Sequence, residues 1–235
     1  MEAADTQALE TGVRYAINDF VIGCKNDGIW NAIKASCILA GARTLAGALV
    51  PLVGTAPTNF NFVAGDYNRE TGLIGDGSTK YLDSNRNNNA DPQDSNHAAV
   101  YISSAVSSGI YFGSENLSTG RNYLDVAGGN TTRSACRGFG SNDAGLISSD
   151  TLAGVSRASS SGYTLRRNGA SINKAVASLT PDSLTVLLFA RQGVGVPTLA
   201  GAPRIAFYSI GESLDLAALD TRVSDLITAI GAAIP

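Results

Sequence analysis

The sequence predicts a mainly β protein, in which an antiparallel β-sandwich forms the middle of the chain and helices lie at both ends. First, between Thr71 and Ile210, short apolar segments alternate with turn residues, and their side chains follow the period of two that is typical of strands. Second, 26 of the 235 residues are glycine, scattered as many tight turns require. Third, the apolar spacing of amphipathic helices occurs only near the two termini.

Near the N-terminus, residues 5–22 are expected to form an amphipathic helix that Gly23 ends. Asn26 or Asp27 would cap a second, short helix. The Gly-, Ala- and Pro-rich segment 40–62 is expected to be a packed connector with little regular structure. The apolar stripes comprise Leu9, Val13, Ala16, Ile17, Phe20 and Val21 in the first helix, and Ile29, Trp30 and Ile33 in the second.

The middle of the chain carries about eleven candidate strands, a number and spacing that favour a two-sheet antiparallel sandwich. The pair Asn168-Gly169 suits a type I′ hairpin turn, because both positions of that turn need positive φ. No segment with helical periodicity intervenes, which argues against a parallel βαβ sheet. The candidate strands are Gly72–Ile74, Lys80–Asp83, His97–Ser103, Gly109–Gly113, Asn122–Ala127, Ser134–Phe139, Leu152–Ala158, Tyr163–Arg167, Ser171–Ala175, Ser183–Arg191 and Arg204–Ile210.

The C-terminal residues are expected to form one amphipathic helix. Ser213 or Asp215 supplies its N-cap, and Gly231 ends it. Its apolar stripe consists of Leu216, Leu219, Val223, Leu226, Ile227 and Ile230. This stripe either packs on the sandwich or binds a partner helix in an oligomer.

The order of local motifs along the chain is similar to that of a known family. The motifs are Asp27–Lys34, Gly75–Leu82, Val100–Ile102, Gly154–Arg157, Tyr163–Gly169 and Arg204–Gly211, followed by the C-terminal helix. Each motif is weak by itself, but their order resembles the concanavalin A-like (laminin-G-like) domain of tailed-bacteriophage structural proteins, including fibre, decoration and tail-associated proteins. The resemblance spans nearly the whole chain. It implies a jelly-roll sandwich that is exposed on the virion, is commonly trimeric, and serves host-surface recognition or particle decoration.

The expected domain organisation has three parts. Residues 1–65 form the N-terminal helices and the packed connector, residues 66–211 form the concanavalin A-like β-sandwich, and residues 212–235 form the C-terminal helix.

Charge and composition exclude several classes of partner. The net charge is −3 and no basic stripe is present, so we expect no nucleic-acid binding. The most apolar stretch, 37–53, is short for a bilayer span and is interrupted by Arg43, so we expect no membrane insertion. The first residues lack the basic and apolar regions of a signal peptide, and we expect synthesis in the reducing host cytoplasm.

The three cysteines, Cys24, Cys37 and Cys136, are expected to be buried thiols without a catalytic or metal-binding role. Their spacing lacks a CxxC pair, and the chain has a single histidine, His97, so a zinc site is disfavoured. We also expect His97 to be structural, because no nucleophile-elbow Gly-x-Ser-x-Gly motif accompanies it.

The acidic residues argue against an enzyme. Retaining glycoside hydrolysis needs two carboxyl groups about 5–5.5 Å apart. A strand with an acidic run such as Glu-x-Asp-x-x-Glu would supply them, but Asp125 stands alone, Glu115 sits in a turn, Glu212 precedes the C-terminal helix, and Asp83 and Asp91 flank a loop. Carboxylates that meet from different strands are the alternative that the sequence leaves open.

Two loops resemble ligand-binding motifs without matching them. The segment Asn85–Asp94 offers many side-chain oxygens, but its spacing fits no calcium-ligand pattern, and Asn and Asp are ordinary turn residues. The segment Gly72–Lys80 superficially resembles a phosphate loop, but Ser78 stands where that loop needs lysine and a strand follows it. We therefore expect no metal and no cofactor.

Four aromatic residues, Tyr101, Tyr111, Phe112 and Tyr123, lie on predicted strands. Their rings would suit the apolar face of a pyranose, but alternating aromatic residues on strands more often belong to the core, which is our interpretation. The binding residues therefore remain unassigned.

Two hypotheses for function follow. In the first, the protein is a non-enzymatic structural component of a phage virion, a tail fibre, adaptor or head decoration, whose partners are other virion proteins and further copies of itself in a homotrimer. In the second, it is a lectin-like, receptor-binding module for host cell-surface glycans. The low share of charged residues, 16%, and the two helical ends favour assembly as the primary role.

Overall fold

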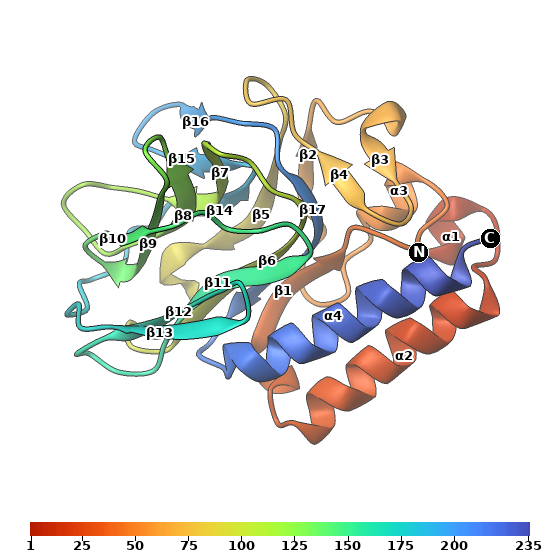
Figure 1. Cartoon of the computed structure of the whole chain (residues 1–235), viewed down its shortest axis with the longest axis horizontal. Coiled ribbons are helices and arrows are strands. Elements are labelled where there is room, and N and C mark those ends of the chain that lie inside the picture. Colours follow the sequence, from red (N-terminus) through yellow and green to blue (C-terminus); the bar gives the residue numbers. More distant parts are fainter.

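Two antiparallel β-sheets stack face to face, and a pair of long helices covers the outer face of one of them (Figure 1). The computed structural model describes every residue from Met1 to Pro235. We name the helix-covered sheet "sheet A" and the other "sheet B". A cluster of 25 buried apolar residues lies between the sheets, and a cluster of 19 lies between sheet A and the helices. Because the second cluster is nearly as large as the first, the helices are a full third layer of the fold.

Sheet A is the central layer, with the strand order β13-β12-β11-β6-β17-β4-β3. Strand β17 pairs with β6 along one edge and with both β1 and β4 along the other. The central strands β6, β11 and β17 are buried almost throughout, as expected for a sheet that is covered on both faces. The strands are β1 (Ile33–Ile38), β3 (Tyr67–Asn68), β4 (Gly72–Ile74), β6 (Asn96–Ser104), β11 (Thr151–Arg157), β12 (Tyr163–Arg167), β13 (Ala170–Lys174) and β17 (Arg204–Gly211).

Sheet B has the order β10-β9-β8-β7-β14-β5-β2, and the β15–β16 hairpin extends from it. All its pairings between strands are antiparallel except that of β15 with β7. The strands are β2 (Thr58–Phe60), β5 (Tyr81–Asn87), β7 (Gly109–Ser114), β8 (Arg121–Ala127), β9 (Thr131–Gly138), β10 (Ser141–Ala144), β14 (Thr185–Leu188), β15 (Ala190–Gln192) and β16 (Pro197–Leu199).

The two long helices, α2 (Thr11–Asn26) and α4 (Leu216–Ala233), lie side by side on sheet A, and the two chain termini are at the same end of the molecule (Figure 1). Gly12, at the start of α2, packs against Ala233, at the end of α4, so closely that a side-chain carbon at Gly12 would lie 2.7 Å from the Ala233 Cβ. The remaining helical segments are short: α1 (Glu2–Asp5), α3 (Leu45–Ala48), and the 3-10 turns Trp30–Ala32, Ala64–Asp66 and Asn88–Ala90.

The predicted fold class is confirmed: the protein is mainly β, with two stacked antiparallel sheets in a jelly-roll-like sandwich, an N-terminal helix and a C-terminal helix. The bounds of β4 and β12 agree with the prediction, and most other predicted strands differ by only a few residues at their ends. The Asn168-Gly169 turn is also confirmed, with φ of 51° and 72°, the positive values that a type I′ turn needs.

The second N-terminal helix was predicted incorrectly. Only the 3-10 turn Trp30–Ala32 forms, and Ile33 begins strand β1. The apolar run Ile33–Ile38 pairs with β17, which has a free edge at that point. A long-range pairing therefore overrides the local helical pattern. The connector 40–62 contributes only the one-turn helix α3 and the three-residue strand β2.

The predicted ends of the long helices need correction. Helix α2 begins at Thr11, not near residue 5, because Asp5 is buried and accepts hydrogen bonds from the Arg43 and Thr44 backbone nitrogens at 2.8 and 2.9 Å. Gly23 does not end α2; it lies inside the helix, where the Arg222 side chain of α4 packs against it. Gly231 likewise lies within α4.

One predicted strand is two strands in the structure. The segment Ser183–Arg191 contains β14 and β15, and Phe189 between them has a φ of 66°. This left-handed residue bends the chain, so that β15 leaves the line of β14 and pairs with β7 and β16. Strands β2, β3, β10 and β16, which have two to four residues each, were not predicted.

The cysteines are buried thiols, as the sequence predicts. All three are buried and unpaired, and burial raises the pKa of each thiol to about 12. Among the helices, none combines the length and the apolar character needed to cross a lipid bilayer.

Candidate functional site

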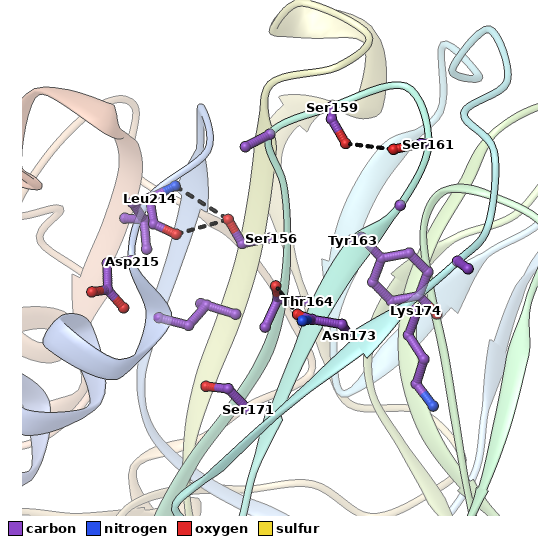
Figure 2. Close-up of a pocket in the computed structure, with 14 residues that line it drawn as sticks. Ser156, Ser159, Ser161, Tyr163, Thr164, Ser171, Asn173, Lys174, Leu214 and Asp215 are labelled. Atoms are coloured by element: carbon purple, nitrogen blue, oxygen red, sulfur yellow. Dashed lines mark hydrogen bonds between the residues drawn. The ribbon is translucent and has the colours of Figure 1, made fainter.

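The largest pocket, of about 560 Å³, lies on the outer face of sheet A, beside the N-terminus of α4 (Figure 2). Strands β12 and β13 and the end of β11 form its floor. The loop Ala158–Gly162 forms one wall, and the segment Leu214–Leu216 at the start of α4 forms another. The pocket exists because α2 and α4 leave this corner of sheet A uncovered.

A row of polar side chains crosses the floor of the pocket. Ser156, Thr164 and Asn173 occupy paired positions on three adjacent strands, so their side chains share one face of the sheet. The Thr164 hydroxyl donates a hydrogen bond to the Asn173 side-chain oxygen at 3.2 Å. The Asn173 amide nitrogen has no partner within the protein and is therefore able to donate to a ligand. Ser171, two residues before Asn173 on β13, also lines the floor.

Ser156 and Asp215 fix the start of α4 relative to this floor. The Ser156 hydroxyl donates to the Leu214 carbonyl oxygen at 2.8 Å and accepts from the Leu214 backbone nitrogen at 3.2 Å (Figure 2). The Asp215 carboxylate caps the helix by accepting from the Ala217 and Ala218 backbone nitrogens at 2.8 and 3.3 Å. The wall formed by α4 is therefore anchored to the sheet by side chains of the pocket itself.

The loop wall is held by a buried arginine. Arg157 is 0% exposed and has no carboxylate partner. Its guanidinium donates to four backbone carbonyl oxygens: Cys136 at 2.6 Å, Ser159 at 2.9 Å, Gly162 at 3.1 Å and Val176 at 2.8 Å. These carbonyls belong to β9, to the loop wall and to the segment after β13. One side chain thus joins the segments that shape the pocket, and holds Ser159 and Ser161 in a defined loop.

The pocket offers hydrogen-bonding chemistry and little else. Its polar side chains are mainly hydroxyl groups and one carboxamide, which both donate and accept, and Asp215 is the sole carboxylate among its lining residues. A single carboxylate that is already used as a helix cap does not make an acid–base pair. The arrangement suits a polyhydroxylated ligand, whose hydroxyl groups both donate and accept hydrogen bonds.

The acidic residues considered from the sequence lie elsewhere, on sheet B. Asp125 is fully buried and pairs with Arg133 at 2.6 Å and with Arg191 at 3.2 Å, while burial raises its pKa. Glu115 pairs with Arg121 and Arg191, both at 3.1 Å. The structure therefore links Asp125 and Glu115 through Arg191, which sequence analysis missed because the connection depends on the bend before β15.

The other acidic candidates also have internal partners. Asp91 pairs with Arg86, and Glu212 pairs with Lys34 at 3.0 Å. Asp83 accepts hydrogen bonds from the Asn85 backbone nitrogen at 2.8 Å and from Thr185 at 3.2 Å. None of these carboxylates lies in the pocket.

The oxygen-rich loop Asn85–Asp94 is organised by a second buried arginine. Arg137 is 0% exposed and donates to backbone carbonyls of this loop, including those of Asn88 and Asp91. The Asn88 amide donates to the Gly120 carbonyl oxygen at 2.7 Å. Backbone oxygens of the loop thus accept internal hydrogen bonds from Arg137, and no group of three or more His, Cys, Asp or Glu side chains is arranged to hold a metal ion.

The remaining candidates are parts of the core. Tyr101, Tyr111, Phe112 and Tyr123 are 5% exposed or less, which confirms their interpretation as core residues and excludes a stacking platform. His97 is fully buried. Its Nδ1 donates to the Glu212 carbonyl oxygen at 2.6 Å, its Nε2 accepts from Ser209 at 2.7 Å, and burial lowers its pKa to about 4. His97 is therefore a neutral, structural residue.

Sequence reasoning did not find the pocket. Its residues come from three strands, a serine-rich loop and a helix start, and each of these alone is ordinary turn or strand sequence. The one signal was the density of hydroxyl side chains in the segment Ser156–Thr164, which joins β11 to β12.

Solved structures with a similar fold include binding domains of bacterial neurotoxins. The receptor binding domain of botulinum neurotoxin mosaic serotype C/D has a TM-score of 0.56 and 12% sequence identity, with 83% of this chain and 50% of that chain covered. The binding domain of botulinum neurotoxin serotype D has a TM-score of 0.52 and 9% identity, with 86% and 51% covered. A structure of botulinum neurotoxin type C, whose cell entry depends on interaction with two ganglioside molecules, has a TM-score of 0.52 and 13% identity, with 85% and 52% covered.

These similarities define the class of fold. The chain shares a β-sandwich architecture with these domains, and it spans about half the length of the neurotoxin chains that it matches. No protein-family model matches the chain, and no curated protein sequence matches it.

Proposed function

We propose that the protein is a non-enzymatic binding module that holds a glycan in the pocket on sheet A. The observation that carries the proposal is the polar row Ser156-Thr164-Asn173, which lies on a sheet that is buried on its other face and is walled by a loop that Arg157 holds. A glycan presents many hydroxyl groups. It is therefore matched by side chains that both donate and accept hydrogen bonds on a rigid scaffold.

The similar structures support this ligand class. They are receptor binding domains, and the cell entry of one of these toxins depends on gangliosides, which are glycan-bearing lipids. The sandwich fold is shared, whereas the ligand of this chain is inferred from its own pocket.

A glycan array tests the proposal, with variants that separate the pocket from the rest of the surface. Replacement of the floor amide, Asn173→Ala, removes the free donor and is expected to weaken binding about tenfold, the effect of one lost polar contact. Asn89→Ala is the matched control, because Asn89 is exposed and has no side-chain hydrogen bond within the protein. Binding to the array that Asn173→Ala leaves unchanged would place the glycan elsewhere, and no binding to any glycan would end the proposal.

We also propose that this module is exposed on a phage virion as a fibre, adaptor or decoration protein. Its partners there would be other virion proteins and further copies of itself in a homotrimer. The order of sequence motifs supports the setting. Four exposed apolar side chains support assembly: Leu117, Phe139, Val194 and Val196 are 57–82% exposed. Light scattering at micromolar concentration and location of the protein in an electron-microscopy map of the particle test this setting; a monomer that is absent from particles would refute it.

A further inference from the structure

Two cations beside the pocket, Lys174 and Arg166, are each paired with a carboxylate of the chain. Lys174, at the end of β13, lines the pocket with its backbone and stem. Its side chain leads away from the polar row (Figure 2), and its ammonium group pairs with Asp143 of β10. Both side chains of this pair are less than 15% exposed. The ammonium is thus withdrawn from the ligand space and held by a carboxylate.

The second cation near the floor is Arg166 of β12. Its Nη1 donates to the Ser171 hydroxyl at 3.2 Å, while its Nη2 pairs with the Asp220 carboxylate of α4 at 2.8 Å. The side chains of Arg166 and Asp220 are only 14% and 11% exposed, so the positive charge of the guanidinium is paired within the protein. Arg166 positions Ser171 and adds no net positive charge to the pocket.

The N-terminus of α4 would by itself favour an anion, because its first backbone N–H groups and its dipole are directed at the pocket wall. Asp215 occupies that role. Its carboxylate accepts from the backbone nitrogens of Ala217 and Ala218, and it is exposed on the pocket wall. Lys174 and Arg166 are paired with Asp143 and Asp220, and the unpaired Arg157 is fully buried. The carboxylate of Asp215 is therefore the one exposed, unpaired charge at the rim.

We infer that the pocket selects neutral glycans and discriminates against carboxylated or sulfated ones. This inference rests on the proposed glycan-binding function and adds the ligand class. A second negative charge near Asp215 would be repelled. No exposed, unpaired cation is available to bind it, because the one unpaired cation beside the pocket, Arg157, is fully buried and donates its N–H groups to backbone carbonyls. At physiological ionic strength, the expected discrimination against one carboxylate is about three- to tenfold and decreases with added salt.

The test is a glycan array that presents each backbone in a neutral form and in a form with one carboxylate, followed by calorimetric titration of the best neutral and anionic pair. Two variants sharpen it. Asp215→Asn removes the rim charge but keeps the helix cap, because asparagine caps as well as aspartate. Asp225→Asn is the matched control, since this exposed residue lies on the same helix about 15 Å further along its axis.

We expect the protein to bind neutral members about three- to tenfold more tightly than their carboxylated counterparts. Asp215→Asn should reduce this ratio towards one by improving the binding of the anionic form, whereas Asp225→Asn should leave it unchanged. Equal or tighter binding of carboxylated glycans by the unaltered protein would overturn the inference and leave the proposed function intact. An unchanged ratio in Asp215→Asn would also overturn it, and no binding to any member would refute both.

Discussion

The buried arginine Arg157 offers the sharpest perturbation of the pocket. We consider Arg157→Met, which keeps an unbranched side chain of similar length but removes the five N–H donors of the guanidinium. The change leaves the carbonyl oxygens of Cys136, Ser159, Gly162 and Val176 without their donor. The loop wall then loses its connection to β9 and to the segment that follows β13.

The expected magnitude follows from these contacts. Hydrogen bonds with a charged donor contribute about 1.5–3 kcal/mol each, so four of them stabilise the fold strongly before the cost of burying the guanidinium is subtracted. Burial of an unpaired guanidinium opposes this by several kcal/mol, and that cost disappears in the variant. Three of the four carbonyls are only partly buried and are able to recover water. We therefore expect a net loss of about 3 kcal/mol in the free energy of unfolding, which corresponds to a decrease of about 6–12 °C in Tm for a chain of this size.

The assay is urea denaturation followed by circular dichroism, together with glycan titration well below the denaturation midpoint. Arg137→Met is the matched control, because Arg137 is also fully buried and binds backbone carbonyls, but those of the loop that contains Asn88 and Asp91. Both variants should lose stability, whereas only Arg157→Met should weaken glycan binding, by about tenfold, because only its loop lines the pocket. Unaltered stability of Arg157→Met, or equal loss of binding in both variants, would refute the reasoning.

Three further predictions concern the core. Burial holds the pKa of His97 at about 4, below its ordinary value of 6.5, so the contribution of the neutral ring to stability is complete above pH 6.5 and decreases as the pH falls towards 4. We expect the free energy of unfolding to decrease by about 2 kcal/mol between pH 7.5 and 5. An NMR titration in which the His97 ring already protonates near pH 6.5 would contradict this prediction. Leu219→Ala, in the fully buried layer between α4 and sheet A, should lower the free energy of unfolding by about 2–5 kcal/mol. Leu117→Ala, at an exposed position, should lower it by less than about 0.5 kcal/mol. Equal effects of the two variants in urea denaturation would argue against a structural third layer. The three buried thiols should react with a maleimide only after denaturation, and rapid labelling of the native protein would show that the core is more open than described.

The sequence predicted the parts of the fold that local physics controls. The Asn168-Gly169 turn was predictable because positive φ at two successive positions favours these residues, and the N-cap at Asp215 because its carboxylate satisfies first-turn amides. The strand β1 was not, because Ile33–Ile38 is stabilised by pairing with β17, which is remote in the sequence. Gly23 was predicted to end the helix, but it lies inside α2. Because it has no side chain, it leaves room there for the Arg222 side chain of α4, which is remote in the sequence.

The candidate site was less accessible to sequence reasoning. Thr164 and Asn173 become neighbours through the register of β12 and β13, and Asp215 reaches them only because α4 folds back across sheet A. The aromatic residues that suggested a sugar platform are buried in the structure: Tyr111 and Phe112 lie between the sheets, and Tyr101 lies between sheet A and the helices. A binding site made of ordinary hydroxyl and amide side chains carries no distinctive sequence pattern, and only the tertiary arrangement reveals it.

The most direct test of the central claim is an NMR titration that follows the side-chain amide of Asn173 while neutral oligosaccharides are added. Glycan binding in the pocket predicts a saturable shift of this resonance, together with those of Thr164 and the loop Ala158–Gly162, and no shift of the exposed Asn89 amide. Saturable shifts confined to another face of the molecule, or none at all, would contradict the assignment of this pocket as the glycan site.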